Sequence, residues 1–351
     1  MWSLRKRRTV RQLTISLAVV ACLTGAAYFC VDVPADLRGN KSSFSTPTRV
    51  LHPLPLKVFP KRRIYALPFD YIINSRHLCL GNDTALPRVD YLFMVFSAVG
   101  NSAHRTAIRE TWAGDAKLYP DTRMAFLLGA TNDSRLQSSV QSESSAYSDI
   151  VQESFVDSYR NVTLKSIMML RWASTFCRHA RFVVKVDDDT YLNVANFFAT
   201  MAARSPDAIY GKLFEGSKPI RDPDNKWHVS VKEYSDSSYP NYVAGSAYVL
   251  GSRVAETLYR ATGYVKPFPM EDAYITGACA ESAGVPRVHH SGFNSQKIES
   301  LCVMKNAVSS HYTSPKEMYA LREQLRRAEF VCYCLLFHFA YYCYCRTSAP
   351  T

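Results

Sequence analysis

Acidic side chains are almost absent from the first 63 residues, which contain 12 lysines and arginines but only Asp32 and Asp36. This segment carries a charge of +10, so the other 288 residues share about +2 of the formal net charge of +12. A strongly basic chain often indicates binding to nucleic acid. Because the basic excess lies in the N-terminal leader, we predict no nucleic-acid partner for the body of the chain.

Charged side chains are missing altogether from residues 13–31, which follow five basic residues. This uncharged stretch is long enough to cross a bilayer. Because basic flanks stay in the cytoplasm, we predict a cytoplasmic tail at 1–12, a transmembrane signal-anchor at 13–31 and a lumenal body. A cleaved signal peptide is the alternative, although its apolar core is usually shorter.

Two further features of the sequence agree with a lumenal body. Ten cysteines suit an oxidising compartment, and some pairing is expected among the four between residues 79 and 302, with connectivity left open. Four Asn-X-Ser/Thr triplets lie on the predicted lumenal side. They predict N-glycosylation at Asn40, Asn82, Asn132 and Asn161.

The chain has no internal repeat, and its amino-acid composition and hydrophobic pattern change along its length. Residues 32–87 are rich in Pro, Ser, Lys and Arg, which predicts a stem. From residue 88, strands and helices alternate, which predicts an α/β fold with a mostly parallel sheet and helices on both faces. Segments 210–214 and 239–250 predict a smaller antiparallel part beside a cleft. Residues 331–351 form a tail rich in Cys and Tyr, to which we assign no function.

The expected elements before the cleft follow from the hydrophobic pattern. Strands are predicted at 91–99, 124–128, 149–151 and 181–187, and helices at 102–112, 133–146 and 161–176.

An apolar run of strand length ends in three adjacent aspartates, Asp187, Asp188 and Asp189. Like charges at the end of a buried strand repel one another unless a cation lies among them. Carboxylate oxygens bind Mn²⁺ or Mg²⁺ and leave coordination positions open for a diphosphate. We therefore predict a divalent-metal site. The alternative is an acidic turn in which Asp189 caps a helix that begins near Asn193.

Other candidate residues have two interpretations each. The pair Glu271 and Asp272 precedes an apolar helix and could supply a general base or merely cap that helix. Arg105 and Arg109 share a helical face and could bind a diphosphate or form a solvated basic surface. Spacing alone does not choose a metal ligand among the histidines His289, His290 and His311.

Eight segments, in order from about residue 90 to 325, resemble the β1,3-galactosyltransferase family. They are residues 104–112, 126–129, 155–165, 185–189, 239–250, 271–274, 291–294 and His311 with 314–318. The resemblance implies a single-pass type II Golgi membrane enzyme with a GT-A-type nucleotide-sugar fold in a catalytic domain at 88–330. It further implies inverting transfer of galactose from UDP-galactose, with Mn²⁺ or Mg²⁺, to a terminal N-acetylhexosamine of a glycoprotein or glycolipid.

The resemblance also implies roles for individual residues. Asp272 is implied as the catalytic base, and the implied metal ligands are Asp187, Asp189 and His311. Donor binding is implied for Arg105, Arg109, Asp187 and Asp188, with a role in local architecture as the alternative for the two arginines. Supporting roles are implied for Glu271, Lys185 and Gly245. Val243-Ala244-Gly245 departs from the Cys-Ser-Gly of many relatives, so one cysteine is missing and the disulfide pattern is open. Two alternatives remain: a β1,3-N-acetylglucosaminyltransferase of the same family, or an inactive lectin-like or chaperone-like relative.

Overall fold

The computed structural model describes residues 57–60, 63–65, 69–80, 86–327, 330–337 and 340–347. The chain divides into two compact units. One contains His52–Ile298 with Asn306–Arg322, and the other contains Met1–Leu51, Glu299–Lys305 and Glu323–Thr351. The predicted tail and anchor, residues 1–31, lie outside the described residues, as do Asn40 and Asn82.

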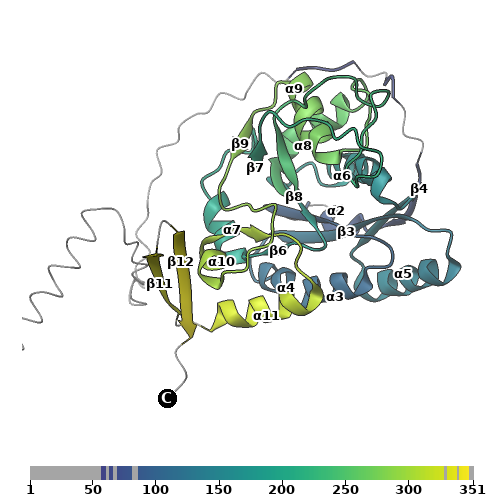
Figure 1. The fold of residues 1–351 in the computed structure, drawn as a ribbon. Coiled ribbons are helices and arrows are strands. Elements are labelled where there is room, and N and C mark those ends of the chain that lie inside the picture. The colour runs from purple at the N-terminus through teal and green to yellow at the C-terminus, as the bar shows by residue number, and fades with distance from the viewer. Residues whose placement is uncertain are drawn as a thin grey trace, which may run out of the picture. The chain divides into compact units, whose positions relative to one another are not determined.

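The larger unit is built on an eight-stranded sheet in the order β1-β4-β3-β2-β5-β8-β7-β9 (Figure 1). Only β1 and β8 run against the other six strands. The prediction of a mostly parallel sheet is therefore confirmed. The strands are β1 (Tyr71–Asn74), β2 (Tyr91–Phe96), β3 (Thr122–Ala130), β4 (Ile150–Val156), β5 (Phe182–Asp187), β7 (Ile209–Phe214), β8 (Tyr242–Gly251) and β9 (Arg287–His289).

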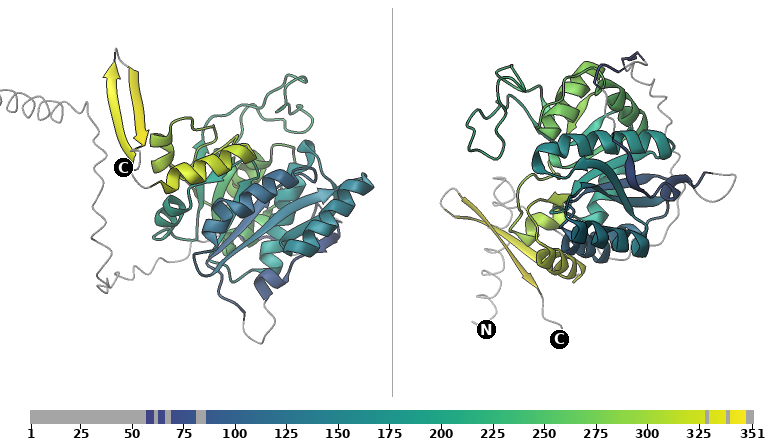
Figure 2. Two further views of the ribbon diagram at one scale, coloured as in Figure 1. Left: turned by 90° about the horizontal axis from the view of Figure 1, so that it is seen from below. Right: turned by 90° about the vertical axis from the view of Figure 1, so that its right-hand side faces the viewer.

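Helices cover both faces of this sheet, as predicted (Figures 1 and 2). One face packs against α6 (Val162–Phe176) and α8 (Ser252–Ala261). The other face carries α3 (Ser102–Glu110), α4 (Trp112–Ala116), α5 (Ser134–Tyr147) and α7 (Val194–Met201). All six residues of β2 are buried, which explains its unbroken apolar sequence because both faces of a central parallel strand meet helices.

Three sequence predictions about elements need correction. The strand predicted at 91–99 ends at Phe96, and the helix predicted at 102–112 breaks at Thr111 into α3 and α4. The strand predicted at 149–151 continues to Val156. The antiparallel strands predicted at 210–214 and 239–250 are confirmed as β7 and β8, which pair with each other in antiparallel orientation within the eight-stranded sheet.

The end of the predicted stem belongs to the sheet. Strand β1 lies within the range 32–87 and pairs with β4 in antiparallel orientation. A disulfide joins Cys79 of α2 (His77–Leu80) to Cys177, which follows α6. Cys279 is buried and free. Within the described part of the chain, no helix has the length and apolar character needed to cross a membrane.

The remaining elements are short or lie toward the C-terminus. They are β6 (Tyr191–Leu192), η2 (Tyr159–Asn161), the π-helix η3 (Ala273–Cys279), α9 (Ala280–Ala283), α10 (Leu301–Asn306), β10 (Ser309–Ser310) and α11 (Pro315–Arg326). The predicted cysteine-rich tail contains β11 (Phe330–Phe337) and β12 (Ala340–Thr347). These two strands pair with each other in antiparallel orientation.

We expect the disulfide to contribute strongly to stability because it closes a loop with a sequence separation of 98 residues. The double variant Cys79→Ala/Cys177→Ala should lose about 2–4 kcal/mol of unfolding free energy in urea titrations. Dithiothreitol should destabilise the wild-type protein more than the double variant, which lacks this bond. Equal stability of both proteins in oxidising buffer would contradict a structural role for the bond.

Candidate active site

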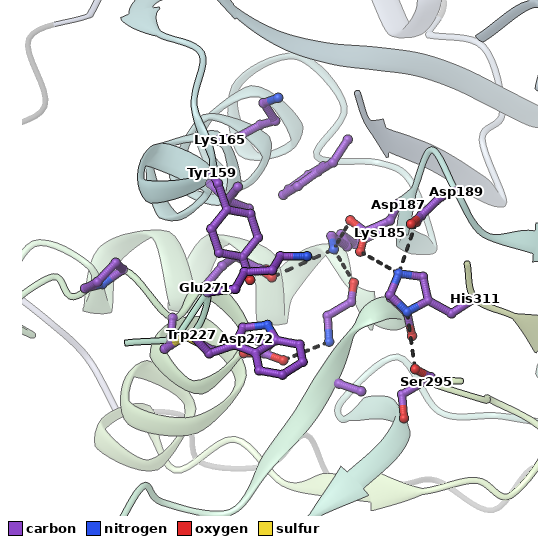
Figure 3. Close-up of a pocket in the computed structure, with 18 of the residues that line it drawn as sticks. Tyr159, Lys165, Lys185, Asp187, Asp189, Trp227, Glu271, Asp272, Ser295 and His311 are labelled. Atoms are coloured by element: carbon purple, nitrogen blue, oxygen red, sulfur yellow. Dashed lines mark hydrogen bonds and ion pairs between the residues drawn. The ribbon is translucent and has the colours of Figure 1, made fainter. Parts of the chain in front are cut away.

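A cavity of about 630 Å³ lies at the carboxyl end of β5 (Figure 3). Ligands of parallel sheets usually bind at this end of the strands. Eight of the residues singled out in the sequence line the cavity: Lys185, Asp187, Asp188, Asp189, Gly245, Glu271, Asp272 and His311. The fold thus brings together segments that lie more than 100 residues apart in the sequence.

His311 and the carboxylates of Asp187 and Asp189 form the first group in the cavity. Their candidate ligand atoms all lie within 4.8 Å of one another. The His311 Nε2 atom is 3.0 Å from Asp189 Oδ1 and 3.9 Å from Asp187 Oδ2. Pairing of β10 with β6 brings them together, because His311 follows β10 and Asp189 lies two residues before β6.

The orientation of His311 suits a metal ligand. Its Nδ1 lies 3.2 Å from the carbonyl of Ser295. In the neutral ring, donation from Nδ1 to that carbonyl leaves the lone pair of Nε2 available to a metal ion, whereas the protonated ring donates from Nε2 to Asp189. Burial opposes the charged forms, but the mutual attraction of His311 and Asp189 raises the pKa of His311 and lowers the pKa of Asp189. The two hard carboxylate oxygens fit Mn²⁺ or Mg²⁺, and the imidazole nitrogen favours Mn²⁺ of the two, because Mg²⁺ prefers oxygen ligands.

The alternative interpretation of the aspartates, as a helix cap, is wrong for Asp189. Helix α7 is capped by Asn193, whose side chain accepts a hydrogen bond from the backbone N–H of Asn196. The central aspartate differs from its neighbours, because Asp188 Oδ2 accepts a hydrogen bond from Asn101 Nδ2 at 3.0 Å. Asp188 lines the cavity but is not part of the candidate metal group.

Asp272 is held in a fixed position at the start of η3. One carboxylate oxygen accepts from the N–H of Ala273 at 2.8 Å and the other accepts from the N–H of Gly245 at 3.0 Å. Burial raises the pKa of Asp272 despite these hydrogen bonds. The two sequence interpretations of Asp272 are therefore compatible, since it caps the π-helix and also faces the cavity.

Glu271 lies deeper than Asp272 and is buried. Its Oε1 accepts a hydrogen bond from the hydroxyl of Tyr248 at 2.9 Å, and burial raises its pKa. A Cβ atom on Gly245 would lie only 3.0 Å from Glu271 Oε2. A side chain at residue 245 would thus crowd both carboxylates, which approach the backbone of this glycine.

The ammonium group of Lys185 lies among these carboxylates. Lys185 Nζ is 2.6 Å from Asp187 Oδ1 and 3.8 Å from Glu271 Oε2, and it also donates to the carbonyl of Gly245. The side chain is 1% exposed. Burial alone would lower the pKa of Lys185, but the charges of Asp187 and Glu271 outweigh burial and raise it.

Arg105 and Arg109 do not line the cavity. The guanidinium group of Arg105 pairs with Glu143 at 2.7 Å, and that of Arg109 pairs with Asp149 at 2.8 Å. Arg109 also lies over the ring of Tyr147. Both arginines are buried, so the solvated-surface interpretation is wrong. Their ion pairs join α3 to α5 and to the start of β4, which favours a role in local architecture over direct donor binding.

His289 and His290 are not among the candidate metal ligands found in the described residues. Their Nδ1 atoms accept hydrogen bonds from the backbone N–H groups of Leu213 and Gly292, respectively. Of the two predicted glycosylation sites that the structure describes, Asn132 is exposed. The side-chain amide of Asn161 donates to the carbonyl of Val156 at 2.8 Å. Glycosylation at these positions stays a prediction.

Several residues of the cavity were not identified from the sequence. Lys165 is buried and contacts Asp157 at 3.0 Å, and both lie in the recognised segment 155–165, which was a usable signal. Tyr159 and Trp227 also line the cavity and are 47% and 42% exposed (Figure 3). Trp227 lies in a segment without helix or strand periodicity, so no sequence pattern pointed to it.

Comparisons with known proteins agree with these observations. The galactosyltransferase family model matches residues 103–291. The chain is 32% identical over 313 residues to beta-1,3-galactosyltransferase 1 of Mus musculus, which covers 87% of this chain and 93% of the mouse protein. It is 31% identical over 256 residues to the Homo sapiens lactosylceramide 1,3-N-acetyl-beta-D-glucosaminyltransferase, which covers 69% and 66% of the two chains.

Among solved structures, one match is the apo structure of WbbM, a bifunctional glycosyltransferase. The TM-score is 0.39 and the sequence identity 11%, and the match covers 68% of this chain and 50% of that one.

We expect Arg105→Met to affect folding more than ligand binding. The variant removes the ion pair between Arg105 and Glu143, but Glu143 keeps Arg109 as a second partner at 2.8 Å. The unfolding free energy should therefore fall by about 1–3 kcal/mol. The affinity for UDP, measured by calorimetry in the presence of Mn²⁺, should stay within about threefold of wild type because the arginine lies outside the cavity. A large loss of UDP affinity at unchanged stability would restore the donor-binding role.

The candidate metal group predicts that Asp189→Asn weakens Mn²⁺ binding by at least about tenfold, because one charged ligand is lost. Asp188→Asn provides a matched control, since its carboxylate bonds to Asn101 and not to His311. Titration of each metal-free variant with Mn²⁺ in a calorimeter compares the two. Equal affinities of the two variants would argue against the assignment.

Proposed function

The chain belongs to the galactosyltransferase family, and from this premise we propose that it is an inverting β1,3-galactosyltransferase. It moves galactose from UDP-galactose to the 3-hydroxyl of a terminal N-acetylhexosamine on a glycoprotein or glycolipid. One observation carries the proposal: a fixed, cavity-facing carboxylate, Asp272, shares its cavity with Asp187, Asp189 and His311. An inverting transfer needs such a base for the acceptor and a separate place for the diphosphate.

Asp272 has the properties of the base. Its two backbone hydrogen bonds hold the carboxylate in one orientation, and its raised pKa makes it a stronger proton acceptor. The acceptor oxygen forms a bond to C1 of galactose on the face opposite the diphosphate, and the bond from C1 to the diphosphate oxygen breaks. The hydroxyl proton passes to Asp272, and UDP leaves with the bonding electron pair, so that the configuration at C1 is inverted.

Asp187, Asp189 and His311 would hold the divalent metal, for which we propose Mn²⁺ or Mg²⁺. When bound there, the ion neutralises the negative charge of the diphosphate and of the departing UDP. Asp188 lines the same cavity, and its hydrogen bond to Asn101 favours a supporting position next to the donor.

We also propose that the enzyme is a single-pass type II protein of the Golgi membrane, with its catalytic domain in the lumen. The uncharged residues 13–31 after a basic tail support this placement. The disulfide between Cys79 and Cys177 supports it too, since such bonds persist in oxidising compartments.

The donor is tested by incubating the purified protein with Mn²⁺, acceptors that end in N-acetylglucosamine or N-acetylgalactosamine, and each labelled UDP-sugar in turn. We expect transfer from UDP-galactose, with a β1,3 linkage in the product by NMR. The similarity to lactosylceramide N-acetylglucosaminyltransferases provides the second candidate, which transfer from UDP-N-acetylglucosamine alone would favour. Binding of glycans without transfer from any donor would favour the inactive, lectin-like alternative.

The base is tested with Asp272→Asn, which keeps the shape of the side chain but removes its proton affinity. We expect kcat to fall by about 10³-fold, within the range for loss of a general base. UDP affinity in the presence of Mn²⁺ should change little, because Asp272 is not a member of the metal group. Steady-state rates at saturating donor, together with calorimetry of UDP binding, measure both quantities. Undiminished turnover would require another base.

A further inference from the structure

Lys185 connects the two chemical halves of the cavity. Its ammonium group contacts Asp187 of the candidate metal group at 2.6 Å and also donates to the carbonyl of Gly245. The N–H of the same glycine donates to Asp272 at 3.0 Å. A continuous series of contacts therefore runs from Asp187 through Lys185 and Gly245 to Asp272 (Figure 3).

The sheet makes this series rigid. Strands β5 and β8 are antiparallel neighbours, and Lys185 lies opposite Tyr248 in their register. Tyr248 is buried and donates to Glu271, whose Oε2 atom is 3.8 Å from Lys185 Nζ. The ammonium group of Lys185 thus lies near Asp187 of β5, Gly245 of β8 and Glu271 of the segment before η3. All three residues line the cavity.

A lysine can neutralise a buried carboxylate of this cavity without the additional contacts that Lys185 makes. Lys165 is a second buried lysine that lines the same cavity, and its Nζ contacts Asp157 and the carbonyl of Ser97. Among the described residues, Lys165 thus forms a local ion pair with Asp157 and bonds to neither Gly245 nor Glu271. Lys165 therefore only compensates a nearby charge, whereas Lys185 also connects the candidate metal group to the segment that holds Asp272.

We propose that Lys185 is a positioning residue that sets the placement of the base Asp272 relative to the metal group, and so the distance at which donor and acceptor meet. The inference rests on the proposed transferase function. Reacting atoms must lie close together and aligned for rapid transfer, and displacements near 1 Å are costly. Without Lys185, the metal group can still bind the donor and the region around Asp272 can still bind the acceptor. The acceptor oxygen and C1 of the donor are then no longer held at the distance and angle needed for reaction.

The position of Lys185 leads to a specific expectation about water. In a misaligned site, water competes better with the acceptor. The water oxygen bonds to C1 while its proton passes to Asp272, the bond from C1 to the diphosphate breaks, and UDP leaves with the electron pair, so that free galactose forms. The ratio of glycan transfer to donor hydrolysis should therefore fall when Lys185 is replaced. A purely structural role predicts fewer active molecules with an unchanged ratio.

The test compares Lys185→Met with the matched variant Lys165→Met, in the full chain with Mn²⁺, UDP-galactose and the acceptor used by the wild type. We expect Lys185→Met to lower kcat for transfer by about 100-fold and the ratio of transfer to hydrolysis by about tenfold. The KM values should change by less than about threefold, because the ligand-binding groups remain. Lys165→Met should leave the ratio at its wild-type value.

A second variant covers the case in which Lys185→Met does not fold because buried carboxylates lack a partner. Lys185→Met/Glu271→Gln removes one of these charges, and the proposal predicts that the double variant folds but keeps the lowered ratio. Melting temperatures identify the folded proteins.

Different results would overturn the positioning role of Lys185 and the proposed transferase function. An unchanged ratio in folded Lys185→Met or in the double variant overturns the positioning role, as does an equal fall in Lys165→Met. Wild-type protein that transfers no sugar from any UDP-sugar overturns the proposed function instead, and the inference with it.

Discussion

Repulsion among carboxylates at one end of the sheet is the constraint on which this structure depends. Asp187, Asp189, Glu271 and Asp272 all line one cavity. Nearby positive charge, or uptake of a proton by one of the carboxylates, makes such a group tolerable in a partly buried place. Lys185 and His311 supply part of that charge, and a divalent ion beside Asp187 and Asp189 would supply more. The arrangement therefore favours binding of a cation and explains why two lysines are buried at its border.

The order of strands determines where this charge collects. Strand β5 lies inside the sheet between β2 and β8, so that its terminal aspartate meets residues of the antiparallel neighbour β8. Gly245 lies within β8 and has no side chain, so the carboxylates of Glu271 and Asp272 can approach its backbone closely. The buried pairs of Arg105 and Arg109 hold α3 and α5 on the opposite face. The charged residues that hold α3 and α5 in place are thus different from those that line the candidate active site.

Local patterns were sufficient to predict part of this site. The strand that ends at Asp187 and the parallel sheet are visible in the sequence because an apolar run and three adjacent acids need no distant partner to be recognised. Asp272 was ambiguous because the N–H group of Gly245 that fixes it lies 27 residues away. The helical spacing of Arg105 and Arg109 was real, but their partners Glu143 and Asp149 follow in a later helix and turn, which spacing cannot disclose.

Strand β1 was missed for a similar reason, since four residues in a proline-rich range carry too little pattern to be recognised as part of a sheet. Its pairing with β4, together with the bond from Cys79 to Cys177, has a practical consequence for the bench. A recombinant fragment that begins at Arg88, where the composition changes, would expose the edge of β4 and leave Cys177 as an unpaired thiol. Fragments intended for crystallisation or enzymology should begin well before Tyr71.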